Sequence, residues 1–165
     1  MIQNNGGGGT SSSTWTATGS KAIDLGILGG GVSFRQAGWA NPNASLASEP
    51  YITGSTNGAL FVSRIPAVAG SILTGIRVKY LGDGGSGGLK LRIYKRLESG
   101  GVTAMTLVGT EQTMLSGTVA STTYTLAAPE TIAADTSYYA EVEAVVTGSG
   151  TSLFDIQAIF SSRDL

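Results

Sequence analysis

The chain has 165 residues, a formal net charge of −1, and neither cysteine nor histidine. This length suits one domain with a substantial buried core. The absence of cysteine excludes disulfides, thiol nucleophiles and zinc–thiolate sites, and the absence of histidine removes the commonest general base and metal ligand. The near-neutral charge provides no overall field that would favour nucleic acid or an acidic membrane.

The beginning of the chain carries no targeting signal. Met-Ile-Gln-Asn-Asn-Gly has neither a basic region nor an apolar one, so no signal peptide is expected. No apolar run approaches the roughly 20 residues of a membrane helix. The sequence predicts a protein made in the cytoplasm of the producing cell, without a membrane partner, which would act outside only by joining a released particle.

Residues 1–20, MIQNNGGGGTSSSTWTATGS, are of low complexity. Four consecutive glycines followed by Thr and Ser cannot hold a core, so we expect a flexible arm here and a folded domain over 21–165. Trp15 is the exception within the arm. It would anchor the arm either to its own domain or to a neighbouring chain.

The next stretch contains short candidate strands and turns. KAIDLGIL and GVSFRQAGW are separated by three glycines, ANPNASLASEP contains two Pro breakers, and GSTNG at 54–58 predicts a turn. From Leu60 onward, apolar and polar residues alternate between Gly-rich turns, which is typical of half-buried antiparallel strands. Strands are predicted over 60–66, 74–81, 89–96, 105–114, 122–128, 136–146 and 153–160. The fold class is therefore all-β, an antiparallel β-sandwich of the jelly-roll kind.

The loop over 82–88 matches two short motifs, G-x-G-x-x-G and G-x-S-x-G. A dinucleotide fingerprint and a nucleophile elbow both require a following helix, whereas LKLRIYKR alternates as a strand. The elbow also needs a histidine, and Lys90, the one nearby base for Ser86, is expected to face solvent. We therefore interpret the loop as a long hairpin connection between two amphipathic strands.

Charge is distributed unevenly along the chain. Residues 61–100 contain seven basic and two acidic side chains, whereas 101–165 contain one basic and seven acidic. One interpretation is cross-strand pairing within a sheet; the other is a basic patch that meets the acidic patch of an identical neighbour. The candidate contact residues are the outward-facing charges of the hairpin and of one later strand, together with the arm tryptophan: Trp15, Arg77, Lys79, Lys90, Arg92, Arg96, Glu141 and Glu143.

Catalytic and metal sites have little support in this sequence. Glu141 and Glu143 lie two residues apart, about 6.5–7 Å along one strand face, and are the only candidates for a glycosidase carboxylate pair. Asp83 could ligate calcium, but that ion needs six to eight oxygens and the loop offers one carboxylate. We expect a protein that is not an enzyme and that has no metal or other cofactor.

From Gly58 onward, the order of elements resembles a known module. The segment GALFVSRIPAVAGSILTGIRVKYLGDGGSGGLKLRIYKR and the later TIAADTSYYAEVEAVV and LFDIQAIF are similar to β-sandwich domains of tailed-phage virion proteins. These include head decoration proteins, head fibres, and tail-fibre or spike tips. The resemblance implies a homotrimer on the virion surface, with the major capsid protein or another virion protein as partner. It carries over no catalytic or ligand residue.

Two functions follow. The main prediction is a bacteriophage structural protein, a capsid decoration or head-fibre protein whose arm around Trp15 docks it. The alternative is a glycan- or receptor-binding module at a tail-fibre or spike tip, with a host surface glycan as partner. In that case the exposed aromatics Trp39, Tyr51 or Tyr94 would act as sugar platforms.

Overall fold

The computed structural model describes residues 20–25, 33–35, 39, 51–66, 68–82, 86–99, 104–148 and 150–161. Trp15, Asp83 and all of the predicted arm except Ser20 lie outside these residues. The described part is built from strands, and it contains no helix of the length and apolarity needed to cross a membrane.

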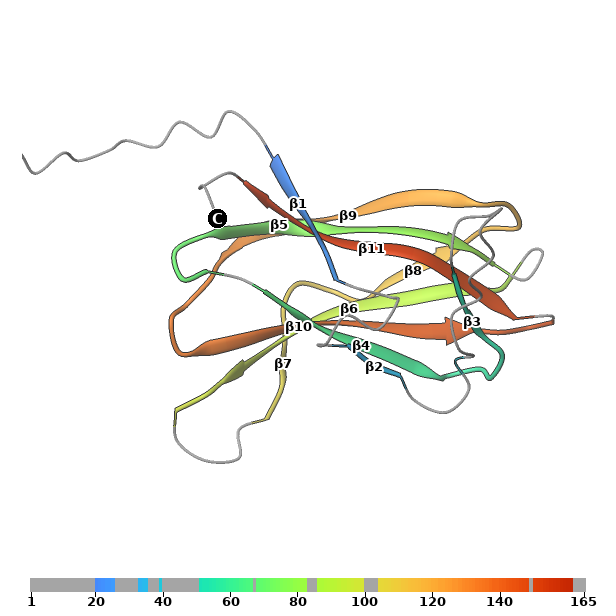
Figure 1. Ribbon diagram of the computed structural model, residues 1–165, viewed down its shortest axis with the longest axis horizontal. Coiled ribbons are helices and arrows are strands. Elements are labelled where there is room, and N and C mark those ends of the chain that lie inside the picture. Colours follow the sequence, from blue (N-terminus) through green and yellow to red (C-terminus); the bar gives the residue numbers. More distant parts are fainter. Residues whose placement is uncertain are drawn as a thin grey trace, which may run out of the picture.

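Eleven strands in the described part form two antiparallel sheets that face each other (Figure 1). One sheet has the order β1-β11-β5-β9, with β3 also beside β11. The other has the order β2-β4-β10-β6-β7, with β8 also beside β6. The strands are β1 (Ser20–Asp24), β2 (Ser33–Arg35), β3 (Ile52–Gly54), β4 (Leu60–Ile65), β5 (Ile72–Leu81), β6 (Gly88–Leu97), β7 (Thr106–Leu107), β8 (Gln112–Leu115), β9 (Ala120–Thr131), β10 (Thr136–Val145) and β11 (Thr151–Ser161).

The core lies between the inner faces of the two sheets. In β10, Tyr138, Ala140 and Val142 are buried, while Glu141 and Glu143 point outward. The same period of two governs β5, β6 and β11, as expected for strands with one face on the core. No buried side-chain nitrogen or oxygen in the described part lacks a hydrogen-bond partner.

The predicted antiparallel β-sandwich is confirmed. The sequence missed the three-residue strand β3, and the predicted strand over 105–114 is two strands, β7 and β8, separated at Gly109. Gly109 has a φ of +75°, a left-handed conformation that suits glycine and ends the first strand. An added Cβ there would also lie 2.5 Å from the Tyr124 hydroxyl.

The predicted hairpin over 82–88 is wrong. β5 belongs to the five-stranded sheet and β6 to the six-stranded sheet, so the loop crosses between sheets. The basic face assigned to that hairpin is therefore split: Arg77 and Lys79 lie on one sheet, and the basic residues of β6 on the other. Alternation looks the same in a hairpin and in a crossover, because both leave one apolar face on the core.

The glycines that suggested a phosphate loop have a steric role instead. A Cβ added at Gly88 would lie 1.9 Å from the carbonyl oxygen of Met114, and one at Gly82 would lie 2.1 Å from that of Gly87. Real Cβ atoms do not tolerate such distances, so close approach of backbone segments explains glycine at these two positions.

Candidate functional site

The charged residues of β6 and β10 form one ion-pair cluster on the outer face of the six-stranded sheet. Arg92 lies 2.8 Å from Glu141 (Nη1 to Oε1) and 2.7 Å from Glu143 (Nη2 to Oε2). Its Nε donates to Glu111 Oε2 at 2.6 Å, just before β8. Lys90 lies 3.8 Å from both Glu111 and Glu143. The cross-strand interpretation of these charges is confirmed, because the pairs are satisfied within one sheet.

The two β10 glutamates share one partner, the Arg92 guanidinium. Partial burial alone would lower the pKa of Arg92, but hydrogen bonds to Glu141, Glu143 and Glu111 outweigh it and raise the pKa well above its usual range. The guanidinium therefore stays charged and holds both β10 carboxylates as acceptors.

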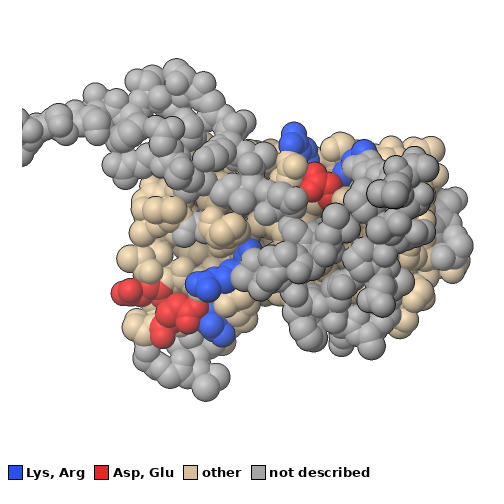
Figure 2. All heavy atoms as spheres, viewed as in Figure 1, with Lys and Arg blue, Asp and Glu red and all other residues tan. Residues whose placement is uncertain are grey.

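Three further contact candidates, Arg77, Lys79 and Arg96, also have partners of their own, whereas Trp15 lies outside the described residues. Arg77 Nε donates to Gln157 Oε1 at 3.1 Å, and the Lys79 ammonium lies 5.9 Å from the centre of the Phe154 ring. On the other sheet, Arg96 contacts Glu98 at 3.1 Å and lies 5.8 Å from the centre of the Tyr139 ring. On the face drawn in Figure 2, basic and acidic side chains lie in small mixed groups. Among the described residues, the basic side chains named for the predicted contact surface are divided between two sheets, and those given above lie beside acidic, amide or aromatic partners.

The aromatic residues proposed as sugar platforms fall into two classes. Trp39 is only 8% exposed, and its Nε1 donates to the carbonyl of Ala59 at 3.0 Å, so its assignment as an exposed platform is wrong. Tyr51 is half-buried against Phe154, with ring centres 5.3 Å apart. Tyr94 is half-buried on the outer face of β6, opposite Tyr139 of β10.

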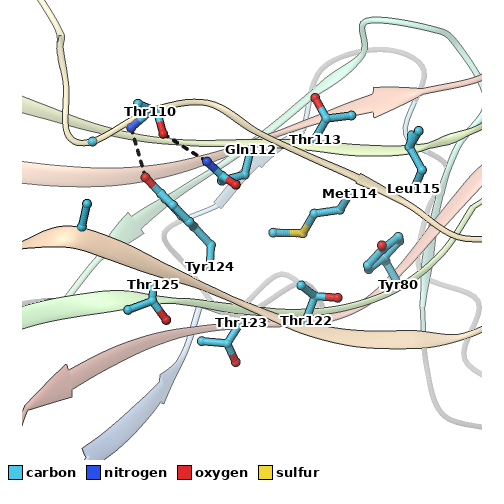
Figure 3. A pocket seen from close by; sticks show the side chains of 12 residues that line it. Tyr80, Thr110, Gln112, Thr113, Met114, Leu115, Thr122, Thr123, Tyr124 and Thr125 are labelled. Atoms are coloured by element: carbon cyan, nitrogen blue, oxygen red, sulfur yellow. Dashed lines mark hydrogen bonds between the residues drawn. The ribbon is translucent and has the colours of Figure 1, made fainter.

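A groove of about 600 Å³ lies between β8 and β9 (Figure 3). β9 is the edge of the five-stranded sheet, and β8 lies outside β6 in the other sheet, so the groove follows the open side of the sandwich. None of its lining residues is charged: they are Tyr80, Gly109, Thr110, Gln112, Thr113, Met114, Leu115, Thr122, Thr123, Tyr124, Thr125 and Ala127.

The groove has an apolar floor and a polar rim. Tyr80, Met114 and Tyr124 are each at most 8% exposed, and Figure 3 shows Met114 and Tyr124 directed into the space between the two strands. The threonines of β9 and the residues around Gln112 form the rim. Buried apolar groups beneath a ring of donors and acceptors are typical of ligand sites.

Hydrogen bonds tie the two walls of the groove together. The Thr110 amide donates to the Tyr124 hydroxyl at 3.0 Å, which links the segment before β8 to β9. Gln112 Nε2 donates to Thr110 Oγ1 at 3.0 Å and to the carbonyl of Glu111 at 3.1 Å. These neighbours hold the Gln112 amide at the rim. The position of this side chain is therefore fixed before any ligand binds.

The groove was not predicted from the sequence. All of its lining residues except Tyr80 and Leu115 fall in two segments interpreted only as weak strands, 105–114 and 122–128. The one indication was composition: STTYT within β9 is uncharged and rich in hydroxyl groups, which is ordinary for an exposed strand.

No protein-family model matches the chain, and no curated protein matches it. Solved structures do. The CBM22-1 xylan-binding domain of Paenibacillus barcinonensis Xyn10C has a TM-score of 0.56 at 8% identity, covering 87% of this chain and 94% of that one. CsCBM6-3 from Clostridium stercorarium, solved in complex with cellobiose, has a TM-score of 0.52 at 12% identity, with the same coverages. The C-terminal CBM6 of LamC from Zobellia galactanivorans has a TM-score of 0.52 at 14% identity, covering 86% of this chain and 99% of that one.

These similarities establish the fold. The chain shares its β-sandwich architecture with carbohydrate-binding modules. At identities this low, the positions of individual ligand-binding residues do not carry over.

Proposed function

We propose that this protein is a non-enzymatic carbohydrate-binding module whose ligand lies in the groove between β8 and β9. The observation that carries the proposal is the uncharged groove itself, with an apolar floor and a rim of hydroxyl and amide groups. The fold shared with carbohydrate-binding modules supports it.

The groove chemistry matches a neutral glycan. Sugars present hydroxyl groups that both donate and accept, together with apolar C–H faces. Threonine hydroxyls likewise donate and accept, Gln112 Oε1 accepts, and Met114 and Tyr124 offer apolar contact. The volume of about 600 Å³ falls within the range of roughly 300–1,000 Å³ of typical ligand sites. Since no cationic side chain lines the groove, nothing there favours a carboxylated or sulfated glycan.

The place where the protein acts is a separate proposal. A glycan-binding site suits a tail-fibre or spike tip, which has to recognise a host surface. The resemblance to tailed-phage virion proteins led to the prediction of capsid decoration and of a homotrimer. Both of these stay predictions. Gene neighbourhood would test it: a position beside tail-fibre genes favours the tip, and one beside the major capsid gene favours decoration.

The groove proposal is tested with the full chain on an array of neutral and acidic glycans, followed by calorimetry with the best neutral oligosaccharide. Gln112→Ala and Thr122→Val each remove one side chain of the rim that would form a hydrogen bond to the ligand. Each should therefore weaken binding about threefold to tenfold, because a hydrogen bond contributes roughly 0.5–1.5 kcal/mol.

Two matched variants serve as controls. Gln157→Ala removes a glutamine on the outer face of β11, and Thr53→Val removes a threonine hydroxyl in β3; neither residue lines the groove. Both should bind like the wild type. Equal losses in the controls and the groove variants would refute the groove as the site, and the absence of any glycan ligand would refute the function.

A further inference from the structure

A second cavity lies where β6, β7 and the β9–β10 connection meet, and the proposed groove does not use it. Its volume is about 450 Å³, and it shares no lining residue with the groove. It is lined by Lys95, Leu97, Ala104, Thr106, Glu130, Ala133, Thr136 and Tyr138. Unlike the groove, this cavity contains charged groups.

The carboxylate of Glu130 is fixed at the cavity wall. Lys95 Nζ donates to Glu130 Oε1 at 2.8 Å, and the Tyr138 hydroxyl donates to the same oxygen at 2.9 Å. Tyr138 is only 2% exposed, so its phenol is an immobile donor, and the Ala133 amide lies 3.5 Å from that hydroxyl. Glu130 keeps 22% of its side chain accessible. It is therefore a preorganised acceptor that a ligand can still reach.

The backbone of β9 is irregular just before this residue. β9 pairs with β5 in register up to Thr125, opposite Gly75, and pairing resumes at Glu130, opposite Leu73. The four residues 126–129 of β9 thus lie opposite Thr74 alone in β5. Such bulges free a segment from the ladder and redirect the side chains beside it, which occurs often at functional sites. Here the irregularity ends at the residue that places its carboxylate on the cavity.

We propose that this cavity is a second sugar site, which takes a neutral sugar residue presenting two adjacent hydroxyl groups. The proposal rests on the proposed carbohydrate-binding function. One hydroxyl donates to the Glu130 carboxylate, and its neighbour accepts from the Lys95 ammonium, which has N–H groups beyond the one directed at Glu130. Leu97, Ala104 and Ala133 provide apolar contact for the sugar C–H face.

The charge of the cavity selects against acidic sugars. One lysine and one glutamate line it, and they are already paired. A ligand carboxylate near Lys95 would also approach Glu130, and like charges at short range repel. A neutral polyol can contact both groups without leaving either charge unbalanced.

The test uses nuclear magnetic resonance of the full chain labelled with ¹⁵N. The probes are the methyl glycosides of glucose, galactose, mannose and xylose, with glucuronic acid as the acidic comparison. At least one neutral glycoside should shift the amide signals of Ala104, Ala133 and Thr136 saturably, and glucuronic acid should bind at least tenfold more weakly. No shift at these residues with any neutral glycoside, or equal binding of glucuronic acid, overturns the proposal.

Variants separate this site from the groove. Glu130→Gln should weaken the neutral glycoside about tenfold or more, since a charged acceptor is lost. Glu98→Gln, at a carboxylate that pairs with Arg96 and does not line the cavity, should change affinity less than twofold. Unchanged affinity in Glu130→Gln overturns the proposal. If Glu130→Gln fails to fold, the wild-type shift map decides.

The same titration distinguishes the two proposals. Thr122→Val in the groove should leave cavity binding unchanged. Shifts confined to groove residues such as Thr110 and Gln112 would overturn the cavity site and leave the proposed function standing. Shifts confined to the cavity would refute the groove instead.

Discussion

At the residue scale, Trp39 shows how little a sequence says about an isolated aromatic. It forms a bridge with Gly54, and its ring meets Phe61 edge-on at 6.5 Å between centres. A Cβ at Gly54 would lie 2.6 Å from that of Ala144 and 3.3 Å from the indole, so glycine there makes room for the ring. This burial depends on residues distant along the chain, and a tryptophan between Gly38 and Pro42 is equally consistent with an exposed platform.

Trp39→Phe should lower the free energy of unfolding by about 1–3 kcal/mol, because it opens a cavity and removes one of the two hydrogen bonds to the Ala59 carbonyl, which still accepts from the Ala144 amide. Denaturant unfolding followed by circular dichroism measures the change. Glycan affinity of the folded variant should match that of the wild type. Lost glycan binding at unchanged stability would restore Trp39 as a platform.

For Arg92, the sequence predicted which strand face the charge lies on but not which residues it pairs with. Alternation placed Lys90 and Arg92 on one strand face and Glu141 and Glu143 on another, which left two interpretations open. The register decides between them, because Arg92 lies opposite Glu141 and Lys90 opposite Glu143 in adjacent strands. Strand order, which the sequence does not encode locally, was the missing information.

At the element scale, the segment from β5 to β6 was interpreted correctly as two strands and wrongly as a hairpin. Strand positions followed from alternation, whose period is local. The partner of each strand depends on how the two sheets close around the core. The groove also depends on how the sheets close, because it forms where β8 and β9 become neighbouring edges of different sheets.

Gly88→Ala tests the contact that places β8. The added methyl group would meet the Met114 carbonyl, so β6 and β8 must separate locally, at a cost of about 1–3 kcal/mol in the free energy of unfolding. Glycan affinity should fall as well, because Gln112 and Thr113 stand on β8. Thermal unfolding and calorimetry measure the two effects.

The control for this change is Ser86→Ala in the same connection. Ser86 is exposed and makes one hydrogen bond, at 3.1 Å to Thr147. Its removal should alter stability by less than about 0.5 kcal/mol. Wild-type stability and affinity in Gly88→Ala would show that β8 is not held by close approach at this glycine.

At the scale of the whole molecule, the composition and the alternation together predicted the fold class, which the carbohydrate-binding modules named above share. The positions of the groove and of the Lys95–Glu130 cavity could not be predicted. Both are assembled from segments whose composition is ordinary, and both depend on which strand ends meet.

Stability of the whole molecule should fall in alkali. Burial and the hydrogen bond to Glu130 raise the pKa of Tyr138, and the hydrogen bond to Glu130 raises the pKa of Lys95. Both groups hold their protons more tightly in the folded state than in the unfolded one. Their contribution is therefore complete below about pH 10 and is lost as the pH rises through the folded pKa values.

Chemical denaturation at several pH values above and below 10 measures this loss. Tyr138→Phe removes one of the two groups, so its stability should decline less steeply above pH 10 than that of the wild type. Thr136→Val, which changes a residue lining the same cavity without a titrating group, is the control and should decline as the wild type does. Parallel declines in the wild type and Tyr138→Phe would contradict the assignment.

The pairing of β1 with β11 also bears on how the molecule can be displayed. Ser20 lies opposite Ser161, so the described strands nearest the two ends of the chain are adjacent at one corner of the five-stranded sheet (Figure 1). β9, which forms one wall of the groove, is the opposite edge of that sheet. A tether attached through either terminal strand would hold the domain by one rim and leave the opposite rim facing outward. Immobilisation on a sensor surface, or fusion to a larger particle, should therefore orient the groove toward free ligand.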